Sequence, residues 1–185
     1  MGFSTIETPR LTLRALAPDD AADLADRRSD PETARYQAWG VPYSVEKAMA
    51  LIAEVSSHPP FAAGAWTQLA IVRREDARIV GDVATRVSDD AHTAEVGYTL
   101  HPWARGAGLA TEAAAGLCDH LVRVVGVHRL EASTHPDNAA SNAVLDRLGF
   151  AREGLQRENY WVEGEVTDTA LFGLLARDWD WPRNH

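Results

Sequence analysis

One stretch of the chain, from Glu95 to Val125, limits the possible folds most strongly, because it reads as a strand, a glycine-rich turn and a long helix. The turn contains two glycines and two alanines in the sequence Arg105-Gly106-Ala107-Gly108-Leu109-Ala110. Small residues leave backbone N–H groups uncovered, so a ligand can approach them closely. The following helix adds unpaired N–H groups and its positive dipole end. The turn is therefore predicted to bind a phosphate or pyrophosphate group.

The spacing of the glycines and their neighbours distinguishes two kinds of ligand that such a turn can bind. A dinucleotide-binding turn has the pattern G-x-G-x-x-G, with an acidic residue about 20 positions later. Gly106 and Gly108 fit, but the third glycine position is Thr111, and Glu131 lies 25 residues after Gly106. That fold also places its turn early, whereas more than half of this chain precedes the turn. The pattern disfavours a nicotinamide or flavin oxidoreductase.

The second pattern is R-x-x-G-x-A, formed by Arg105, Gly108 and Ala110 and followed by Thr111. It resembles the acetyl-CoA pyrophosphate loop of the GNAT N-acetyltransferase superfamily. The segment from Asn138 to Phe150, NAASNAVLDRLGF, resembles the N-x-x-S-x-x-x-L-x-x-x-G-F segment of the same superfamily. The two motifs occur in the expected order, 30 residues apart from Gly108 to Asn138. The resemblance covers about residues 7 to 178.

Two further segments look like the subgroup of ribosomal-protein N-terminal acetyltransferases of the RimJ/RimL type. They are Glu7 to Arg14, and the ending from Gly164 to Leu175. The resemblance implies one GNAT domain over residues 1–185, with an acetyl-CoA-dependent N-acetyltransferase activity. In such an enzyme the acetyl group passes directly to a primary amine within a ternary complex.

The apolar periodicity predicts a single α+β domain with seven strands and four helices. The strands are expected at 10–16, 68–72, 79–87, 94–100, 128–134, 151–160 and 166–175, and the helices begin at 18, 44, 108 and 139. A strand, a helix and a strand in succession around 108–125 imply a right-handed crossover. We therefore expect a largely antiparallel twisted sheet with one parallel pair at the cofactor site. Gly97 is a candidate for a β-bulge that opens the backbone toward a ligand.

Composition excludes several classes of protein. A chain of 185 residues suits one domain. No apolar run reaches the roughly 18 residues of a membrane span, and residues 1–4 lack the features of a signal peptide, so a cytoplasmic protein without membrane contact is expected. The single cysteine, Cys118, excludes an internal disulfide and a cysteine-based metal cluster. It is expected to be a buried small hydrophobe.

The net charge and the histidines limit the kinds of partner and metal that the protein is expected to bind. A net charge of −9 argues against nucleic acid, which needs clustered Lys and Arg. An acidic surface also attracts cationic amines, although solubility is a simpler explanation of the charge. The seven histidines form no metal-binding motif, so no metal is expected. The sequence leaves a homodimer open, with six tryptophans as candidates for an interface.

Acetyl transfer to an amine needs a neutral amine, a site for the developing oxyanion, and a proton for the leaving thiolate. In related acetyltransferases a carboxylate near the glycine turn acts as base, so Glu95 is the candidate base; its alternative roles are an anchor for the acceptor's ammonium group and a solvated surface charge. The backbone N–H groups from Val96 to Tyr98 are candidate oxyanion donors. Ser141 matches the family motif and is the candidate proton donor, with water as its rival. A tyrosine acid on this helix cannot be carried over, because Asn142 and Ala143 stand nearby.

The remaining candidates bind acetyl-CoA or the acceptor. The resemblance implies a cofactor site made of Val96, Tyr98, Leu100, Arg105, Gly106, Ala107, Gly108, Leu109, Ala110, Thr111, Asn138 and Ser141. Capping of a helix is the alternative role for Asn138. Tyr36, Trp39, Glu95 and His135 are candidates for the acceptor site. The aromatic pair could equally cover the core, and His135 could equally lie in a surface turn.

The nature of the acceptor depends on the cost of deprotonating it. At pH 7 the neutral form costs about 1.4 kcal/mol for an α-amino group and about 4.6 kcal/mol for a lysine. A single modest base handles the α-amino group more easily, which together with the subgroup resemblance favours a protein or peptide N-terminus. Small amines such as amino sugars, polyamines, aminoacyl conjugates and antibiotics remain alternatives. So does a non-catalytic acyl-CoA-binding module.

Overall fold

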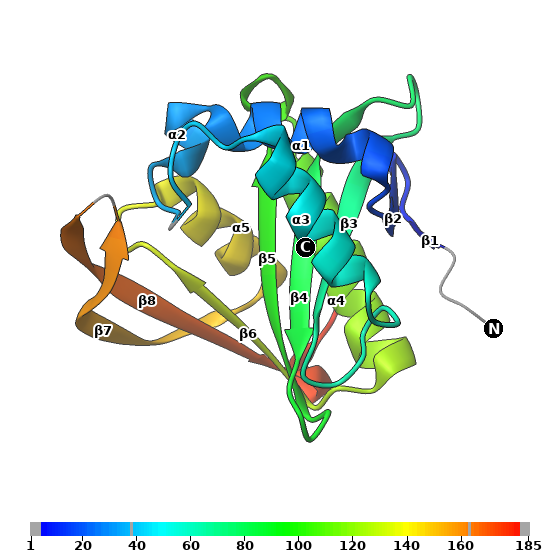
Figure 1. Cartoon of the computed structure of the whole chain (residues 1–185). Coiled ribbons are helices and arrows are strands. Elements are labelled where there is room, and N and C mark those ends of the chain that lie inside the picture. The colour runs from blue at the N-terminus through cyan, green and yellow to red at the C-terminus, as the bar shows by residue number, and fades with distance from the viewer. Residues whose placement is uncertain (1–4, 38, 163, 182–185) are drawn as a thin grey trace.

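The centre of the molecule is one sheet of eight strands (Figure 1). The computed structural model describes residues 5–37, 39–162 and 164–181. The strands lie in the order β1-β2-β3-β4-β5-β6-β8-β7, and every neighbouring pair is antiparallel except β5 and β6. Their bounds are β1 (Thr5–Glu7), β2 (Leu11–Ala15), β3 (Trp66–Arg73), β4 (Ile79–Val87), β5 (Thr93–Leu100), β6 (Arg129–Thr134), β7 (Ala151–Val162) and β8 (Glu165–Leu175).

Helices cover both faces of the sheet. The α-helices are α1 (Ala21–Ser29), α2 (Pro31–Ala34), α3 (Val45–Ser56), α4 (Leu109–His120) and α5 (Ala139–Leu148), with 3₁₀ turns η1 (Pro18–Asp20), η2 (Pro102–Ala104) and η4 (Ala176–Asp178). α1 and α3 pack with Ala70 of β3, whereas α4 and α5 share a core cluster with Leu69 and Ile71. Successive strand residues point to opposite faces, so these two pairs of helices lie on opposite faces. In Figure 1 no helix lies in front of β6, β7 and β8.

The predicted fold class is confirmed, with one more strand and one more helix than the periodicity indicated. β1 is three residues long, too short to show an alternating pattern, and it exists because it pairs with β2. The additional helix is α2, which follows directly after the end of α1 at Ser29. The Asp30 carboxylate accepts a hydrogen bond from the Thr33 N–H at 2.7 Å and starts α2, with Pro31 at its first position.

The opening in the sheet comes from strand separation. β5 and β6 pair at three positions, the last being Glu95 with Glu131, and no pair follows. The bulge expected at Gly97 is wrong, because the β4–β5 register runs without a shift from Gly81 and Leu100 to Val87 and Ala94. The backbone of β5 beyond Glu95 is therefore free of a strand partner on the β6 side.

The helix expected over 108–125 is α4 followed by a π-helical turn, η3 (Leu121–Val125). The extra residue of a π turn rotates the helix face that follows it. Val124 lies in this turn and is 69% exposed. Cys118 is fully buried in the core, as expected, and burial raises the pKa of its thiol. No helix among the described residues is long and apolar enough to span a membrane.

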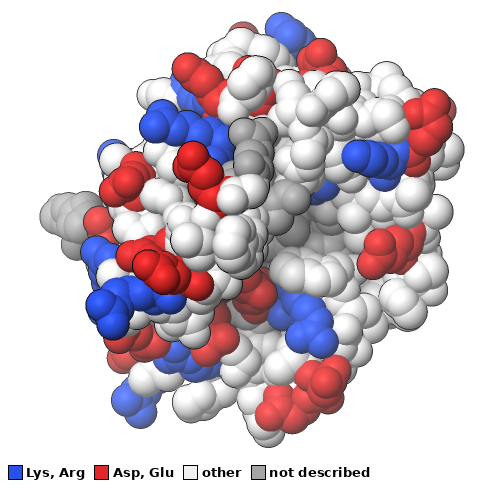
Figure 2. All heavy atoms as spheres, turned by 60° about the vertical axis from the view of Figure 1, so that its left-hand side comes forward, with Lys and Arg blue, Asp and Glu red and all other residues white. Residues whose placement is uncertain are grey.

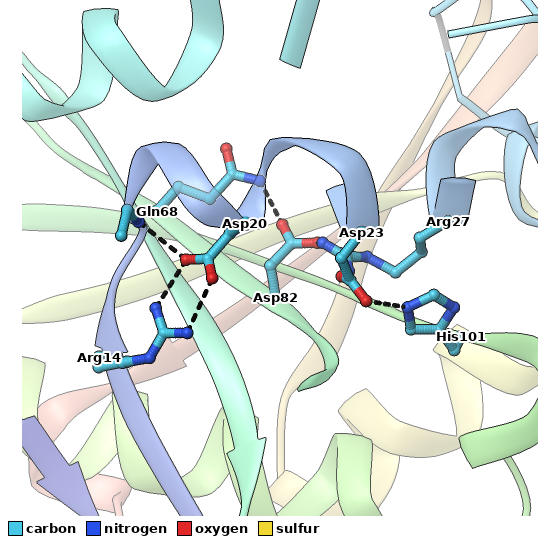
Figure 3. A network of polar contacts seen from close by, with 8 residues as sticks. Arg14, Asp20, Asp23, Arg27, Gln68, Asp82 and His101 are labelled. Carbon is cyan, nitrogen blue, oxygen red and sulfur yellow. Dashed lines mark hydrogen bonds and ion pairs between the residues drawn. The ribbon is translucent and has the colours of Figure 1, made fainter. Parts of the chain in front are cut away.

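A buried polar network joins α1 to the sheet (Figure 3). The Arg27 side chain is 1% exposed and donates to Asp82 Oδ1 through Nε at 3.2 Å and Nη2 at 2.8 Å. The other Asp82 oxygen accepts from the Gln68 amide. Arg27 also donates to Asp23, whose second oxygen lies 3.0 Å from His101 Nε2. The guanidinium thus has carboxylates on two sides and is stable in the interior only with them.

Replacing Asp82 with alanine should lower the free energy of unfolding by about 3–5 kcal/mol, because it leaves Arg27 buried and largely unpaired. Urea unfolding followed by circular dichroism measures this change. Asp76→Ala is the control: it removes an Arg73 partner in an exposed turn, where solvent screens the pair, and should leave the unfolding midpoint nearly unchanged. Equal destabilisation by the two substitutions would contradict the role assigned to the buried pair.

Candidate active site

A cavity of about 890 Å³ lies where β5 and β6 separate. Residues from β3 to β8, from α3 and from the loop after α2 line it. Figure 2, in which the β6–β8 side comes forward, shows a hollow near the middle of this face. Six Asp or Glu residues and two Arg residues line the cavity, and one of the arginines, Arg129, is bonded to Glu131 and Glu153. The cavity is therefore acidic, which suits a cationic ligand.

The turn between β5 and α4 has the backbone geometry of an anion-binding site. Gly106 and Gly108 have φ angles of +79° and +75°, which glycine adopts without strain. Within the described residues, none of the six consecutive N–H groups from Gly106 to Thr111 has a hydrogen-bond partner. Such groups at the start of a helix bind phosphates and other anions. Ala107 is exposed within this run, whereas Leu109 anchors it in the core.

Residues from the start of β2 hold this turn in place. The Arg10 guanidinium donates to the Ala107 carbonyl at 3.0 Å and to Glu112, in the first turn of α4, at 2.6 Å. Glu112 also accepts from the Thr8 hydroxyl at 2.7 Å. Burial works to raise the pKa of Glu112, but these hydrogen bonds outweigh it and lower the pKa below its usual value. Thr8 can lie this close because α4 has Gly116 opposite it: a Cβ there would be 2.7 Å from Thr8 Cγ2.

The Arg105 side chain connects the turn to α2. Its Nη2 atom donates to Thr33 Oγ1 at 2.6 Å, and its guanidinium lies 3.8 Å from Asp30 and 3.6 Å from Glu32. Arg105 therefore fixes the segment that leads to the aromatic loop, the loop after α2 that carries Tyr36 and Trp39. Its predicted place in the acetyl-CoA site rests on its position at the start of the turn, since its charge is already paired.

A tyrosine on β5 reaches the candidate proton donor on α5. The Tyr98 hydroxyl donates to the Ser141 carbonyl at 3.0 Å, and its oxygen lies 3.0 Å from Ser141 Oγ. Burial raises the pKa of Tyr98, so its hydroxyl stays protonated at neutral pH. Because the Tyr98 hydroxyl donates its proton to the Ser141 carbonyl, its oxygen is left to accept a hydrogen bond from the Ser141 hydroxyl. This contact orients the Ser141 side chain. A tyrosine thus belongs to this site, although it comes from a strand and not from the helix.

Asn138 caps α5, as its alternative role predicted. Its Oδ1 atom accepts a hydrogen bond from the Ser141 N–H at 3.1 Å. The Nδ2 atom has no partner among the described residues, so it can still donate to a ligand carbonyl. Asn138 lines the cavity together with Tyr98 and Ser141.

Glu95 lies at the point where the two strands part. It is exposed, lines the cavity, and accepts a weak hydrogen bond from Ser133 Oγ at 3.4 Å. Its neighbour across the parallel pair, Glu131, is bound to Arg129, whereas no ion pair of Glu95 is present in the described part of the chain. Glu95 is therefore a carboxylate with room to bind a proton or a cation.

The other β5 candidates offer their backbone. Val96 and Leu100 are buried, and Tyr98 packs against the same core, so their side chains point toward the α4 and α5 face. A ligand in the opening can reach their N–H and carbonyl groups. Gly97 lies between them and faces open space, since a Cβ atom at this position would have no other atom within 4 Å.

The acceptor candidates lie together along one side of the cavity. Tyr36 packs against His135, with ring centroids 4.8 Å apart, and its hydroxyl is 3.4 Å from the Asp137 carbonyl. Trp39 donates to the Arg28 carbonyl at 3.0 Å, and the Arg28 guanidinium lies 4.3 Å above its ring. All these residues except Asp137 line the cavity, so the aromatic loop forms part of its wall. His135 accepts a hydrogen bond from the Asp137 N–H, as expected of a turn residue.

Sequence reasoning missed two parts of this site. The first is the Arg10 contact with the turn, for which the segment from Glu7 to Arg14 was the available signal. The second is the pair of Gln68 and Asp82, which also lines the cavity. Neither residue belongs to a motif, and strand periodicity alone does not reveal a buried carboxylate. In the described part of the chain, no group of three or more His, Cys, Asp or Glu side chains is arranged to hold a metal ion.

Comparison with known proteins agrees with this geometry. A family model described as Acetyltransferase (GNAT) domain matches residues 10–151. The uncharacterized N-acetyltransferase p20 of Bacillus licheniformis is 31% identical over 96% of this chain and 99% of its own length. The [ribosomal protein uS5]-alanine N-acetyltransferase of Escherichia coli K12 is 25% identical, covering 94% and 92%. Mycobacterium smegmatis RimJ, solved with CoA-disulfide, superposes with a TM-score of 0.81 at 26% identity, covering 94% and 85%.

The family match covers the opening of the sheet and both sequence motifs, and the relatives cover nearly the whole chain. The chain therefore belongs to the GNAT family and is an N-acetyltransferase.

Proposed function

We propose that residues 1–185 form one acetyl-CoA-dependent domain that acetylates the α-amino group at the N-terminus of a protein or peptide. One observation carries the proposal: in the described part of the chain, six adjacent N–H groups without a partner lie in the turn between β5 and α4, and β5 lines the acidic cavity. An anion can therefore bind at the end of a strand whose free edge faces a site for cations. The two substrates of this reaction are an anionic thioester and a cationic amine, which match these two regions.

The residues present fit acetyl-CoA, which supplies the thioester. Its pyrophosphate would be held by the N–H groups of Gly106 to Thr111, with the uncovered backbone at Gly108 allowing close approach. Arg10 donates to the Ala107 carbonyl and so holds the turn in place, while its charge is paired with Glu112. The amide groups of the pantetheine arm would face Asn138 and the β5 backbone around Val96.

Each remaining residue then has a task in the transfer. Glu95 removes a proton from the acceptor's ammonium group, directly or through water. Among the candidate β5 N–H groups from Val96 to Tyr98, those on the open edge of the strand donate to the carbonyl oxygen as negative charge develops on it. Ser141, held beside Tyr98, turns its hydroxyl to give its proton to the departing sulfur and takes a proton back from water. Tyr36, Trp39 and His135 contact the acceptor from the side wall.

An α-amino group is favoured because one exposed carboxylate serves as base. Bringing a lysine to its neutral form at pH 7 costs about 3 kcal/mol more than an α-amino group, so a single carboxylate such as Glu95 is better matched to the α-amino group. The relative named as a [ribosomal protein uS5]-alanine N-acetyltransferase supports the same choice. Small amines remain the alternative acceptors, since the acidic cavity would bind them as well.

The direct test mixes the purified protein with acetyl-CoA and a panel of amines while free thiol is measured. The panel contains tetraalanine amide and other short peptides, lysine blocked at its α-amino group, an amino sugar and a polyamine. We expect the free α-amino peptides to give the highest kcat/KM. Binding of coenzyme A without turnover of any amine would instead indicate an acyl-CoA-binding module.

Replacing Glu95 with glutamine should lower kcat by about 100-fold or more while coenzyme A binds as before, because the base is lost and the turn is untouched. Thiol release and calorimetric titration with coenzyme A measure the two effects. Glu131→Gln is the matched control, since Glu131 pairs with Glu95 across the sheet but is bound to Arg129, and its kcat should change by no more than a few-fold. Unchanged turnover in Glu95→Gln would remove Glu95 from the base role.

Replacing Gly108 with valine should weaken coenzyme A binding by about tenfold or more, because a branched side chain both strains the positive φ angle and covers the N–H groups. Gly126, at the far end of the same helical segment, has a φ angle of +85° and open space around its Cα. Gly126→Val therefore carries similar strain without touching the turn and should keep wild-type affinity. Equal affinities for the two variants in calorimetric titration would show that the pyrophosphate binds elsewhere.

A further inference from the structure

A shallow track crosses the sheet from the opening to β3. The backbone register aligns Gly97 of β5 with Ala84 of β4, and Ala84 with Gln68 of β3. All three residues line the cavity. Gly97 has no side chain and Ala84 has only a methyl group, so these two positions leave the sheet surface low. At the far end of this track stands the Gln68 side chain.

The Gln68 amide is held in one orientation. Asp82 is a carboxylate whose Oδ1 atom already accepts two hydrogen bonds from Arg27, and its Oδ2 atom accepts one from Gln68 Nε2. A carboxylate accepts and does not donate, so the NH₂ end of the amide must face Asp82. Arg27, 1% exposed, holds the Asp82 carboxylate in place through both hydrogen bonds. The carbonyl end of Gln68 must therefore point away from Asp82, as Figure 3 shows.

The carbonyl oxygen of Gln68 is an acceptor without a partner in a residue that lines the cavity. Gln68 is 7% exposed, and no hydrogen bond to its Oε1 atom is present among the residues that the structure describes. Oε1 is not one of the buried side-chain atoms that lack a partner, so water or a ligand in the cavity can reach it. The bond to Asp82 accounts for the NH₂ group of Gln68 and leaves the carbonyl oxygen available to a ligand.

We propose that Gln68 determines acceptor specificity by accepting a hydrogen bond from a backbone N–H of the bound peptide. The inference rests on the proposed function and extends it to the residues beyond the reacting amine. Gln68 lies two strands from Gly97, which is roughly 9–10 Å at a spacing of 4.7–4.9 Å between strands. An extended peptide rises about 3.4 Å per residue. The N–H that reaches Gln68 therefore belongs to the third or fourth residue of the acceptor.

Asp82 and Arg27 act as positioning residues in this scheme. They touch the Gln68 amide or one another, and they prevent the amide from turning its NH₂ end into the cavity. A site that offers a fixed acceptor rejects a ligand lacking the matching donor, because the ligand then covers the carbonyl oxygen and leaves it unpaired. The selectivity thus falls on acceptors with a continuous peptide backbone, and simple monoamines gain nothing from it.

The test uses tetraalanine amide as acceptor, together with analogues in which one N–H is replaced by an ester oxygen. For the wild-type enzyme, an ester at the third or fourth residue should lower kcat/KM by about five- to tenfold. An ester at the second residue, too near the amine to reach Gln68, should change it by less than twofold. If the wild-type enzyme were insensitive to both distal esters, the inference would be overturned. This part of the test needs no substitution in the protein.

The second arm compares variants on the same acceptors. In Gln68→Met, kcat/KM for tetraalanine amide should be about five- to tenfold lower than in the wild type. For the ester analogue to which the wild type is sensitive, the same substitution should lower kcat/KM by no more than a further twofold. Gln156→Met, on β7 at the other end of the cavity, should retain the full ester effect. Gln68→Asn, one methylene too short to span the distance, should match Gln68→Met and replaces it if that variant does not fold. Full ester sensitivity in the Gln68 variants would assign the effect to another residue.

The control measurements separate this inference from the proposed function. Coenzyme A should bind the Gln68 variants with wild-type affinity, because Gln68 lies away from the turn. A wild-type enzyme that acetylates peptide N-termini but is insensitive to both distal esters would overturn the inference alone. A wild-type enzyme that acetylates only non-peptide amines would overturn both the proposed function and the inference. A wild-type enzyme that binds coenzyme A and acetylates no amine would overturn the proposed function, and the inference with it.

Discussion

The separation of β5 from β6 after three residue pairs is the constraint on which the rest of the structure depends. Up to Glu95 the two strands satisfy each other's backbone polar groups, and beyond it both edges need other partners. The structure bridges the gap with side chains, since Tyr98 on β5 reaches Ser141 on the helix that follows β6. The parted strands therefore stay connected at their far ends. Between them remains a backbone edge that a substrate can pair with.

The cations around the glycine turn show how the protein divides its tasks. Arg105 stands at the start of the turn, yet its charge is paired within the protein to residues of α2. Arg10 contacts the turn itself, and it does so through the Ala107 carbonyl. Both arginines fix the position of the loop, so that its N–H groups are already in place. A rigid set of dipoles loses little entropy when an anion binds.

The parts of the site that the sequence predicted are the local ones. Gly106, Gly108, Asn138 and Ser141 owe their positions to turn and helix chemistry within a few residues, so motif spacing located them. The contact of Tyr98 with Ser141 spans 43 residues, and that of Arg27 with Asp82 spans 55. Such pairs depend on which strands are neighbours and which face each residue occupies. A single sequence gives the faces but not the partners, and for that reason the bulge at Gly97 was expected where the structure has diverging strands.

Gly116 connects the packing of α4 to the chemistry of the turn. A glycine within a helix costs about 0.5–1 kcal/mol relative to alanine, so close contact with Thr8 is what justifies it here. The same threonine holds Glu112, and Glu112 holds Arg10. The depth at which α4 rests on the sheet therefore sets where its first N–H groups stand. Natural variation at this seam could retune cofactor affinity from two helical turns away, without altering any atom that touches the cofactor.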